Sequence, residues 1–188
     1  MGAPRTTTLL IGSLAPAMGA PSQARFCIRH GQPTRIDTFD AEGRVTIRSV
    51  YDGAQARSNT RVALGTTCVF GYEPAGTDFR TLETGHNHQF RQSITGCDAP
   101  PAQLVEIIVG GRSAVTLSGC RFDAMHFQRA NVSVPGPSIT VDALFVPRLG
   151  WPVESTVRAV GAASGTRMVI EALGTAEDTA KLCEAPQS

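Results

Sequence analysis

The sequence has little net charge and almost no lysine. Its 188 residues carry 17 basic and 16 acidic side chains, which gives a formal net charge of +1, and only 18% of the residues are charged. Proteins that hold a nucleic-acid backbone present a basic surface. This balance therefore argues against nucleic-acid binding as a primary role and predicts no sequence-specific nucleic-acid partner. Lys181 is the only lysine, a bias that codon usage explains more simply than arginine-rich interfaces do.

Long hydrophobic runs are missing too. A membrane-spanning helix needs roughly 20 apolar residues, and no stretch beyond the N-terminal segment approaches that length, so we expect no membrane span. Residues 1–24 allow two interpretations. An apolar stretch around Leu9–Ile11 follows Arg5, and Ser22–Ala24 has the small-x-small pattern that signal peptidase accepts, which favours a cleaved signal peptide. The stretch is short and interrupted by Pro16, which suits an extended arm equally well.

Paired cysteine motifs are absent. None of the five cysteines lies in a CxxC pattern, so neither a zinc ribbon nor a thioredoxin-like site is supported. In an oxidising compartment we expect two disulfides and one leftover thiol, whereas in the cytosol all five would be small buried side chains. A third alternative is that the leftover thiol links neighbouring subunits. The candidate disulfide or interface cysteines are Cys27, Cys68, Cys97, Cys120 and Cys183.

Catalytic signatures are also lacking. The chain has no G-x-S-x-G nucleophile motif. The glycine pair at Gly110-Gly111 joins two predicted strands, with no helix behind it to bind a phosphate. Acidic residues such as Asp40, Glu42, Glu106 and Asp142 are spread over different strands and turns, so no carboxylate pair is predicted. We therefore expect no enzymatic activity, no catalytic residue and no bound cofactor.

The sharpest candidate for a ligand site is the pair His86 and His88, with His126 or His30 as a further ligand. Two imidazoles at this spacing on a strand point to the same face and can bind zinc or copper. The pair lies among glycine and asparagine, in a predicted loop, and no carboxylate-rich surroundings are evident. A solvated or contact-making polar loop is therefore the favoured interpretation, and a metal site is the weaker alternative.

Glycine and turn residues, in contrast, are plentiful. The chain has 19 glycines and 12 prolines, and strong helix formers are scarce before the last dozen residues, as is typical of many short strands joined by turns. We predict an all-β fold, an antiparallel β-sandwich or barrel with long loops. Residues 25–188 form a single β domain in this interpretation, and the acidic turn at Thr175–Asp178 starts a short C-terminal helix that ends at Cys183.

Three hairpins are predicted from alternating apolar and polar residues around turn sequences. The first spans Arg35–Tyr51 and turns at Asp40–Gly43. The second joins Leu104–Val109 to the strand around Val115 through Gly110-Gly111. The third joins 156–160 to 167–173 around Gly161–Gly165.

The connecting segments are predicted as follows. Residues 62–72 form a strand region with a bulge or break at Gly65, and residues 78–101 form a long irregular loop. Prolines mark residues 147–152 as a loop whose Trp151 fills a gap in the core.

The most regular pattern covers Ala114–Val146, which reads AVTLSGCRFDAMHF, then a Pro/Gly break, then SITVDALFV. Apolar residues alternate with polar ones on both sides of the break, which predicts half-buried strands joined by a loop. The part from Val115 to Val146 is similar to the paired strands found late in tail tube proteins of tailed bacteriophages. That resemblance implies a β-sandwich or barrel subunit that assembles into rings, usually hexameric, and stacks them into a conduit for DNA.

Two functional interpretations follow. Under the resemblance, the chain is a structural subunit of a phage virion, made in the host cytoplasm, which self-assembles through strand edges and loops. Its partners are then copies of itself and other virion proteins. The alternative is a secreted or periplasmic, disulfide-containing β-sandwich that acts as a binding or adhesive module, with a signal peptide cleaved at Ala24.

Overall fold

The computed structural model describes residues 7–16, 22–29, 34–40, 42–52, 55–75, 83–98, 102–133 and 138–174. These residues form antiparallel strands and one short 3-10 turn, η1 (Val62–Leu64). The strands are β1 (Thr7–Ala15), β2 (Ser22–Arg29), β3 (Thr34–Phe39), β4 (Val45–Asp52), β5 (Gln55–Arg61), β6 (Thr66–Glu73), β7 (Asn87–Thr95), β8 (Ala102–Leu117), β9 (Cys120–Ser133), β10 (Ile139–Val146), β11 (Trp151–Ala159) and β12 (Thr166–Leu173).

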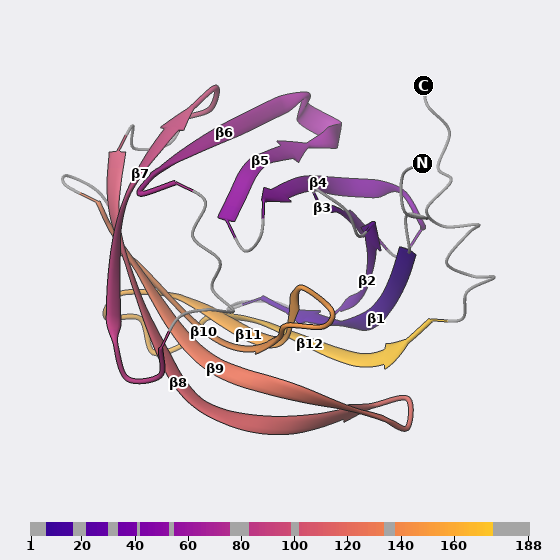
Figure 1. The fold of residues 1–188 in the computed structure, drawn as a ribbon. Helices are drawn as coiled ribbons and strands as arrows, with labels where there is room; N and C mark the ends of the chain where they lie inside the picture. The colour runs from indigo at the N-terminus through magenta and orange to yellow at the C-terminus, as the bar shows by residue number, and fades with distance from the viewer. Residues whose placement is uncertain are drawn as a thin grey trace, which may run out of the picture.

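The strands form a closed barrel in which each strand pairs with its neighbours in the sequence, and β1 pairs with β12 to complete the circle (Figure 1). Short connections between consecutive strands favour this up-and-down arrangement. The all-β, antiparallel prediction is confirmed, and the open choice between sandwich and barrel is decided in favour of a barrel. None of the described residues forms a helix long and apolar enough to cross a membrane.

The first and third predicted hairpins are confirmed. Asp40 stabilises the β3–β4 turn because its carboxylate accepts hydrogen bonds from the backbone N–H groups of Glu42 and Arg44, at 3.1 and 2.9 Å. The loop around Gly161 joins β11 to β12. Gly65 has a φ of 61° and separates η1 from β6, as the predicted break requires.

The predicted turn at Gly110-Gly111 is wrong. Val109 pairs with Phe127 and Arg112 with Met125, so the two glycines oppose one residue and form a bulge inside the single strand β8. The chain reverses later, at Ser118-Gly119, where φ is 48° and 80°. A two-residue hairpin turn favours positive φ at both positions, which a serine–glycine pair can adopt. The break before Ile139 does join paired strands, β9 and β10, as predicted.

Residues 78–101 are not one long irregular loop. β7 occupies the middle of this segment, with buried Phe90, Gln92 and Ile94 alternating with exposed neighbours. Two of the inward positions, His88 and Gln92, are polar, which hid the period of two from the sequence pattern. The remaining parts of the segment include residues outside the described ranges.

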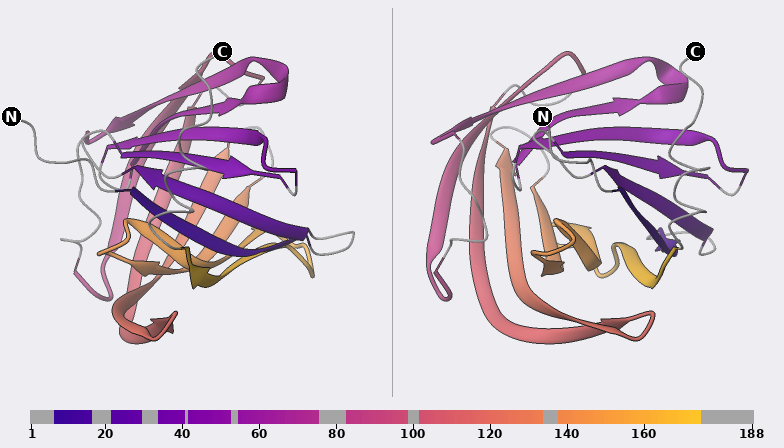
Figure 2. Two further views of the ribbon diagram at one scale, coloured as in Figure 1. Left: turned by 90° about the vertical axis from the view of Figure 1, so that its right-hand side faces the viewer. Right: turned by 45° about the vertical axis from the view of Figure 1, so that its right-hand side comes forward.

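The long β8–β9 hairpin extends beyond the other strands and curves around under the barrel (Figure 2). Its end packs against the largest core cluster through Leu117 and Phe122, which are 4% and 7% exposed. At the tip, Leu173 of β12 donates its backbone N–H to Oγ of Ser118 at 2.9 Å. The hairpin end is therefore held against the barrel by both apolar and hydrogen-bonding contacts.

Trp151 fills space in the core, as predicted, but the predicted loop over residues 147–152 is wrong at its end, because Trp151 and Pro152 begin β11 and pair with β10. Its ring lies 6.0 Å from the ring of Phe26 and 5.8 Å, edge to face, from the ring of Tyr51. Since these partners come from β2 and β4, the contacts connect β11 to strands on another side of the barrel. Such aromatic contacts contribute beyond simple area burial.

The structure describes a strand within residues 1–24, whereas the predicted C-terminal helix lies beyond the residues that it describes. Thr7–Ala15 forms β1, and its Leu10 is fully buried in the core. A molecule cleaved after Ala24 would lack β1, the strand that pairs with both β2 and β12 to close this barrel. The predicted helix from Thr175 to Cys183 lies outside the described residues.

Candidate binding groove

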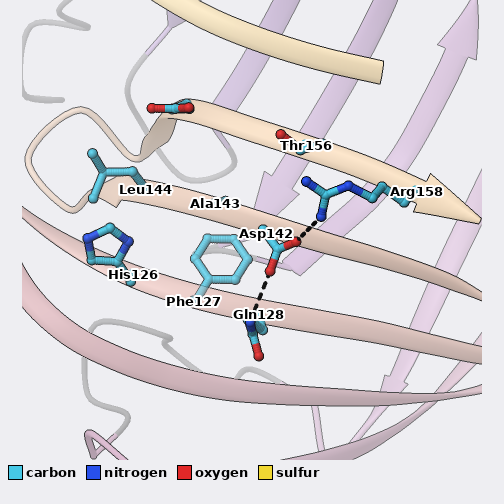
Figure 3. Close-up of a pocket in the computed structure, with 9 residues that line it drawn as sticks. His126, Phe127, Gln128, Asp142, Ala143, Leu144, Thr156 and Arg158 are labelled. Carbon is cyan, nitrogen blue, oxygen red and sulfur yellow. Dashed lines mark hydrogen bonds and ion pairs between the residues drawn. The ribbon is translucent and has the colours of Figure 1, made fainter. Parts of the chain in front are cut away.

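A groove of about 360 Å³ crosses the outer face of β9, β10 and β11 (Figure 3). Two cross-strand rows form it. Gln128 pairs with Asp142 and Asp142 with Thr156, while His126 pairs with Leu144 and Leu144 with Glu154. Side chains two residues apart on a strand point to the same face. The two rows therefore present their side chains side by side on one surface.

The charges in the groove are paired with one another. Oδ2 of Asp142 lies 2.6 Å from Nη1 of Arg158, and Oδ1 accepts a hydrogen bond from Nε2 of Gln128 at 3.0 Å. Glu154 binds Arg167 at 2.7 Å. The Asp142 and Arg158 side chains are 42% and 40% exposed, so their ion pair contributes little to stability. Together with the Glu154–Arg167 pair, it provides each carboxylate of the groove with a positively charged partner.

The groove does not contain a nucleophilic triad among the described residues. Oγ of Ser113 lies 3.5 Å from Nε2 of His126, longer than a good hydrogen bond. No described carboxylate binds the other imidazole nitrogen to orient it, as a Ser–His–acid arrangement requires. What the groove offers is hydrogen bonding from amide, hydroxyl, carboxylate and imidazole groups beside the apolar Leu144.

His86 and His88 lie close together, but the described residues provide no metal-binding group of three or more ligands around them. The ring centroids of His86 and His88 lie 6.4 Å apart, and Nε2 of His86 lies 3.4 Å from a carboxylate oxygen of Glu83. The described residues contain no group of three or more His, Cys, Asp or Glu side chains that could hold a metal ion. The metal hypothesis for His86 and His88 stays a prediction.

The other two histidines do not join this pair. His126 faces the outer groove, whereas His88 pairs with the buried Ile107 on the inward face, so a wall of the barrel separates them. His30 lies outside the described residues.

Of the four cysteines that the structure describes, three form disulfide bonds and one is a free thiol. Cys68 in β6 and Cys97, just after β7, form a disulfide, and Cys27 is disulfide-bonded as well. Cys120 is exposed and free at the start of β9. Cys183 lies outside the described residues. Sequence spacing gave no signal for the Cys68–Cys97 pairing, because it follows from the antiparallel β6–β7 register.

Most residues of the groove were missed by sequence reasoning. Gln128, Glu154, Thr156 and Arg158 are single polar residues on strands and belong to no motif. Asp142 stands in the sequence as one of several scattered carboxylates, with nothing to indicate its neighbours. The alternation within β9, β10 and β11 was the one available signal, but it does not show which strands lie side by side.

Antiparallel strands that pair with their sequence neighbours and close on themselves define a meander β-barrel, here with a polar groove on its outer wall. Two solved structures share this fold. One is a protein from Bacteroides fragilis NCTC 9343, described as exported and as having a YmcC-like fold, with a TM-score of 0.51 and 10% identity over 89% of this chain and 95% of that chain. The other is the hypothetical lipoprotein YmcC from Escherichia coli K12, with a TM-score of 0.50 and 11% identity over 92% of this chain and 86% of that chain. No protein-family model and no curated protein matches the sequence.

These likenesses show the fold, and they overturn the resemblance to phage tail tube proteins. The similarity of Val115–Val146 to tail tube strands reflects three consecutive strands, β8 to β10, that any meander contains. Closure also removes the physical basis of the earlier interpretation. Every described strand has a partner on both sides, so none offers a free edge for ring assembly. The virion and tail interpretation is therefore wrong. Assembly of the chain with copies of itself stays a prediction.

Proposed function

We propose that the chain is an exported, disulfide-containing β-barrel binding module, secreted or periplasmic, with no catalytic activity. The Cys68–Cys97 disulfide carries this proposal, because disulfides persist in oxidising compartments and are rare in the cytosol. The fold is consistent with it, since one of the similar structures is described as exported and the other as a lipoprotein.

The proposed ligand of the β9–β11 groove is neutral and rich in hydroxyl groups, such as a saccharide unit. Both groove carboxylates, Asp142 and Glu154, are already paired with arginine, so a charged ligand would have to break an ion pair. The side-chain carbonyl of Gln128 and the hydroxyl of Thr156 remain able to bind ligand hydroxyl groups, and Leu144 provides an apolar contact.

The export part is tested on protein from the native source. Cell fractions are alkylated without reductant, and the modified cysteines are located by peptide mass mapping. We expect the protein outside the cytoplasm, with Cys120 alkylated and Cys68 and Cys97 protected. Cytoplasmic protein with Cys68 and Cys97 both alkylated would contradict export.

The binding part is tested with a panel of immobilised neutral oligosaccharides. We expect binding of the wild type to fall by about tenfold or more in Gln128→Ala and Thr156→Ala, because each loses a hydrogen-bonding group. The matched control is Thr95→Ala, an exposed threonine on β7 away from the groove. Equal binding by all four proteins, or none by the wild type, would remove the groove from the proposal.

A further inference from the structure

The barrel carries another hollow, of about 670 Å³, which shares no lining residue with the β9–β11 groove. In an up-and-down barrel alternate turns lie at the same end, so the β3–β4 and β5–β6 turns are neighbours there (Figure 2). η1, in the β5–β6 turn, contacts β4. The lining comes from the β3–β4 turn, β4 and η1 and is mainly aliphatic: Val45, Ile47, Val62, Ala63 and Leu64.

The apolar side chains of η1 are exposed on a turn of fixed shape. Val62 is 41% and Leu64 69% exposed, and no residue of η1 is buried. Gly65 donates its backbone N–H to the carbonyl oxygen of Val62 at 3.3 Å, and the hydroxyls of Thr60 and Thr67, in the flanking strands, lie 2.9 Å apart. Exposed apolar side chains beside a hollow indicate a contact site for an apolar group.

The lining also contains two arginines, of which one is paired. Arg44 lies 2.9 Å from a carboxylate oxygen of Asp40, which lines the hollow as well, and 2.9 Å from one of Glu42, which does not. The guanidinium of Arg61 has no ion-pair or hydrogen-bond partner among the described residues. Its hairpin contains no acidic residue between positions 55 and 72. An apolar lining therefore lies beside a positive charge that is free to bind an anion.

We propose that this hollow binds a single-chain carboxylate, with its apolar chain against Ile47, Val62 and Leu64 and its carboxylate on the guanidinium of Arg61. The chain covers apolar surface that is otherwise exposed to water, and a guanidinium binds a carboxylate through two parallel hydrogen bonds. One free guanidinium matches the single charge of a carboxylate. A concave lining of this size favours one bound molecule over a membrane surface.

This site goes beyond the neutral-ligand groove on the outer wall, and neither depends on the other. Purified full-length protein is titrated with decanoate by isothermal titration calorimetry, below the concentration at which decanoate forms micelles. Decanol supplies the chain without the charge, and acetate supplies the charge without the chain. We expect saturable binding of decanoate, binding of decanol that is weaker by about tenfold or more, and no binding of acetate. No binding of decanoate, or equal affinity for decanol, would overturn the proposal.

Two other occupants of the hollow give different results. Vesicles of anionic phospholipid that bind the protein, while decanoate does not, would assign the apolar turn to a membrane surface. A dimer in analytical ultracentrifugation that Leu64→Ser dissociates would assign it to a second copy of the chain. Either result would overturn the proposal, whereas a monomer that binds decanoate and leaves the vesicles unbound supports it.

Variants of the two kinds of contact locate the site. We expect Arg61→Gln to weaken decanoate binding by about tenfold and Leu64→Ser by about fivefold. Both residues are exposed, so neither change should disturb the fold. The matched controls are Arg91→Gln, at an exposed arginine of β7, and Val160→Ser, at a 64% exposed valine just after β11. Wild-type affinity in Arg61→Gln or in Leu64→Ser, or an equal loss in the controls, would overturn the proposal.

Discussion

Polar residues on the two faces of this sheet have opposite surroundings. On the outward face they neutralise one another: Asp37 is 2% exposed and binds both Arg35 and Arg48 at 2.9 Å. On the inward face Arg129 has only the neutral Asn131 as a hydrogen-bond partner among the described residues. Removing one partner from a buried ion pair is costly, so a carboxylate held by two arginines is best explained as structural.

The ionisation of Tyr51 should make the stability of the fold depend on pH. Burial raises the pKa of Tyr51 to about 12, above its usual value near 10, because the phenolate would lose its hydration. The neutral form therefore stabilises the fold below about pH 10, and this contribution is lost as the pH rises toward about 12. Two pH units correspond to at most about 2.7 kcal/mol, and to less here because Tyr51 is only partly buried.

The measurement is an ultraviolet titration of tyrosinate absorbance in the native protein, in a Cys120→Ser background that prevents thiol exchange. We expect a late-titrating component that Tyr51→Phe removes. Urea unfolding of the same pair should lose stability less steeply above about pH 10 in the phenylalanine variant. An unchanged late component in Tyr51→Phe would contradict the assignment.

At the scale of elements, glycines without side chains shape two strands for different reasons. A Cβ on Gly12 of β1 would lie 2.1 Å from the carbonyl oxygen of Val169 in β12, next to a register shift that starts at Ile11. A Cβ on Gly111, in the bulge of β8, meets nothing within 4 Å. The first glycine allows close approach of two backbones, and the second only marks an irregular position.

Replacement of these glycines by alanine should separate the two roles. We expect Gly12→Ala to lower the free energy of unfolding by about 1–3 kcal/mol, because one backbone must move away from the other. Gly111→Ala should change it by less than about 1 kcal/mol. Urea unfolding of both variants checks this, and equal effects would show that the β1–β12 contact is not tight.

The disulfide between Cys68 of β6 and Cys97, just after β7, should stabilise the folded state. It closes a loop with a sequence separation of 29, for which chain entropy predicts roughly 3–4 kcal/mol of stabilisation. We expect the double variant Cys68→Ala with Cys97→Ala to lose about this much in chemical denaturation without reductant. Cys120→Ala, at an exposed free thiol, should change stability by less than about 0.5 kcal/mol. Equal stability of the two variants would contradict a structural role for the disulfide.

At the scale of the whole molecule, closure depends on β1. It pairs with β2 over residues 7–14 and with β12 over residues 10–15, so its removal exposes two strand edges and opens the core around Leu10. Exposed edges favour aggregation, and a sheet opened in this way loses a buried face. We therefore expect the barrel to stay closed only in molecules that retain β1.

A deletion tests this directly. We expect a protein that lacks residues 1–24 to lose the near-ultraviolet circular dichroism of packed aromatic residues and to show no cooperative thermal transition. A protein that lacks residues 1–6 stops short of β1 and should keep both. If residues 25–188 fold as cooperatively as the full chain, the barrel does not need β1, and cleavage at Ala24 is compatible with the fold.

The strand content and several of the turns of this protein could be predicted from local sequence patterns. Alternation at Val45–Tyr51 and the turn at Asp40–Gly43 gave the β3–β4 hairpin, because local backbone preferences and a period of two act over a few residues. The same local rules failed where one sequence pattern is compatible with two structures, or where polar residues occupy inward positions. Gly110-Gly111 fits a turn as well as a bulge, and the polar inward residues of β7 hid its alternation.

Closure of the sheet, the pairing of the cysteines and the contacts between side chains of different strands depend on the three-dimensional fold. The pairing of β1 with β12, the Cys68–Cys97 bond and the contact of Tyr51 with Trp151 all join residues that are distant in the chain. Register and curvature bring them together, and both are set by how the whole set of strands buries its apolar face. A period of two tells which residues share a face of one strand, but not which strand lies beside it or whether that face becomes the inside of a barrel.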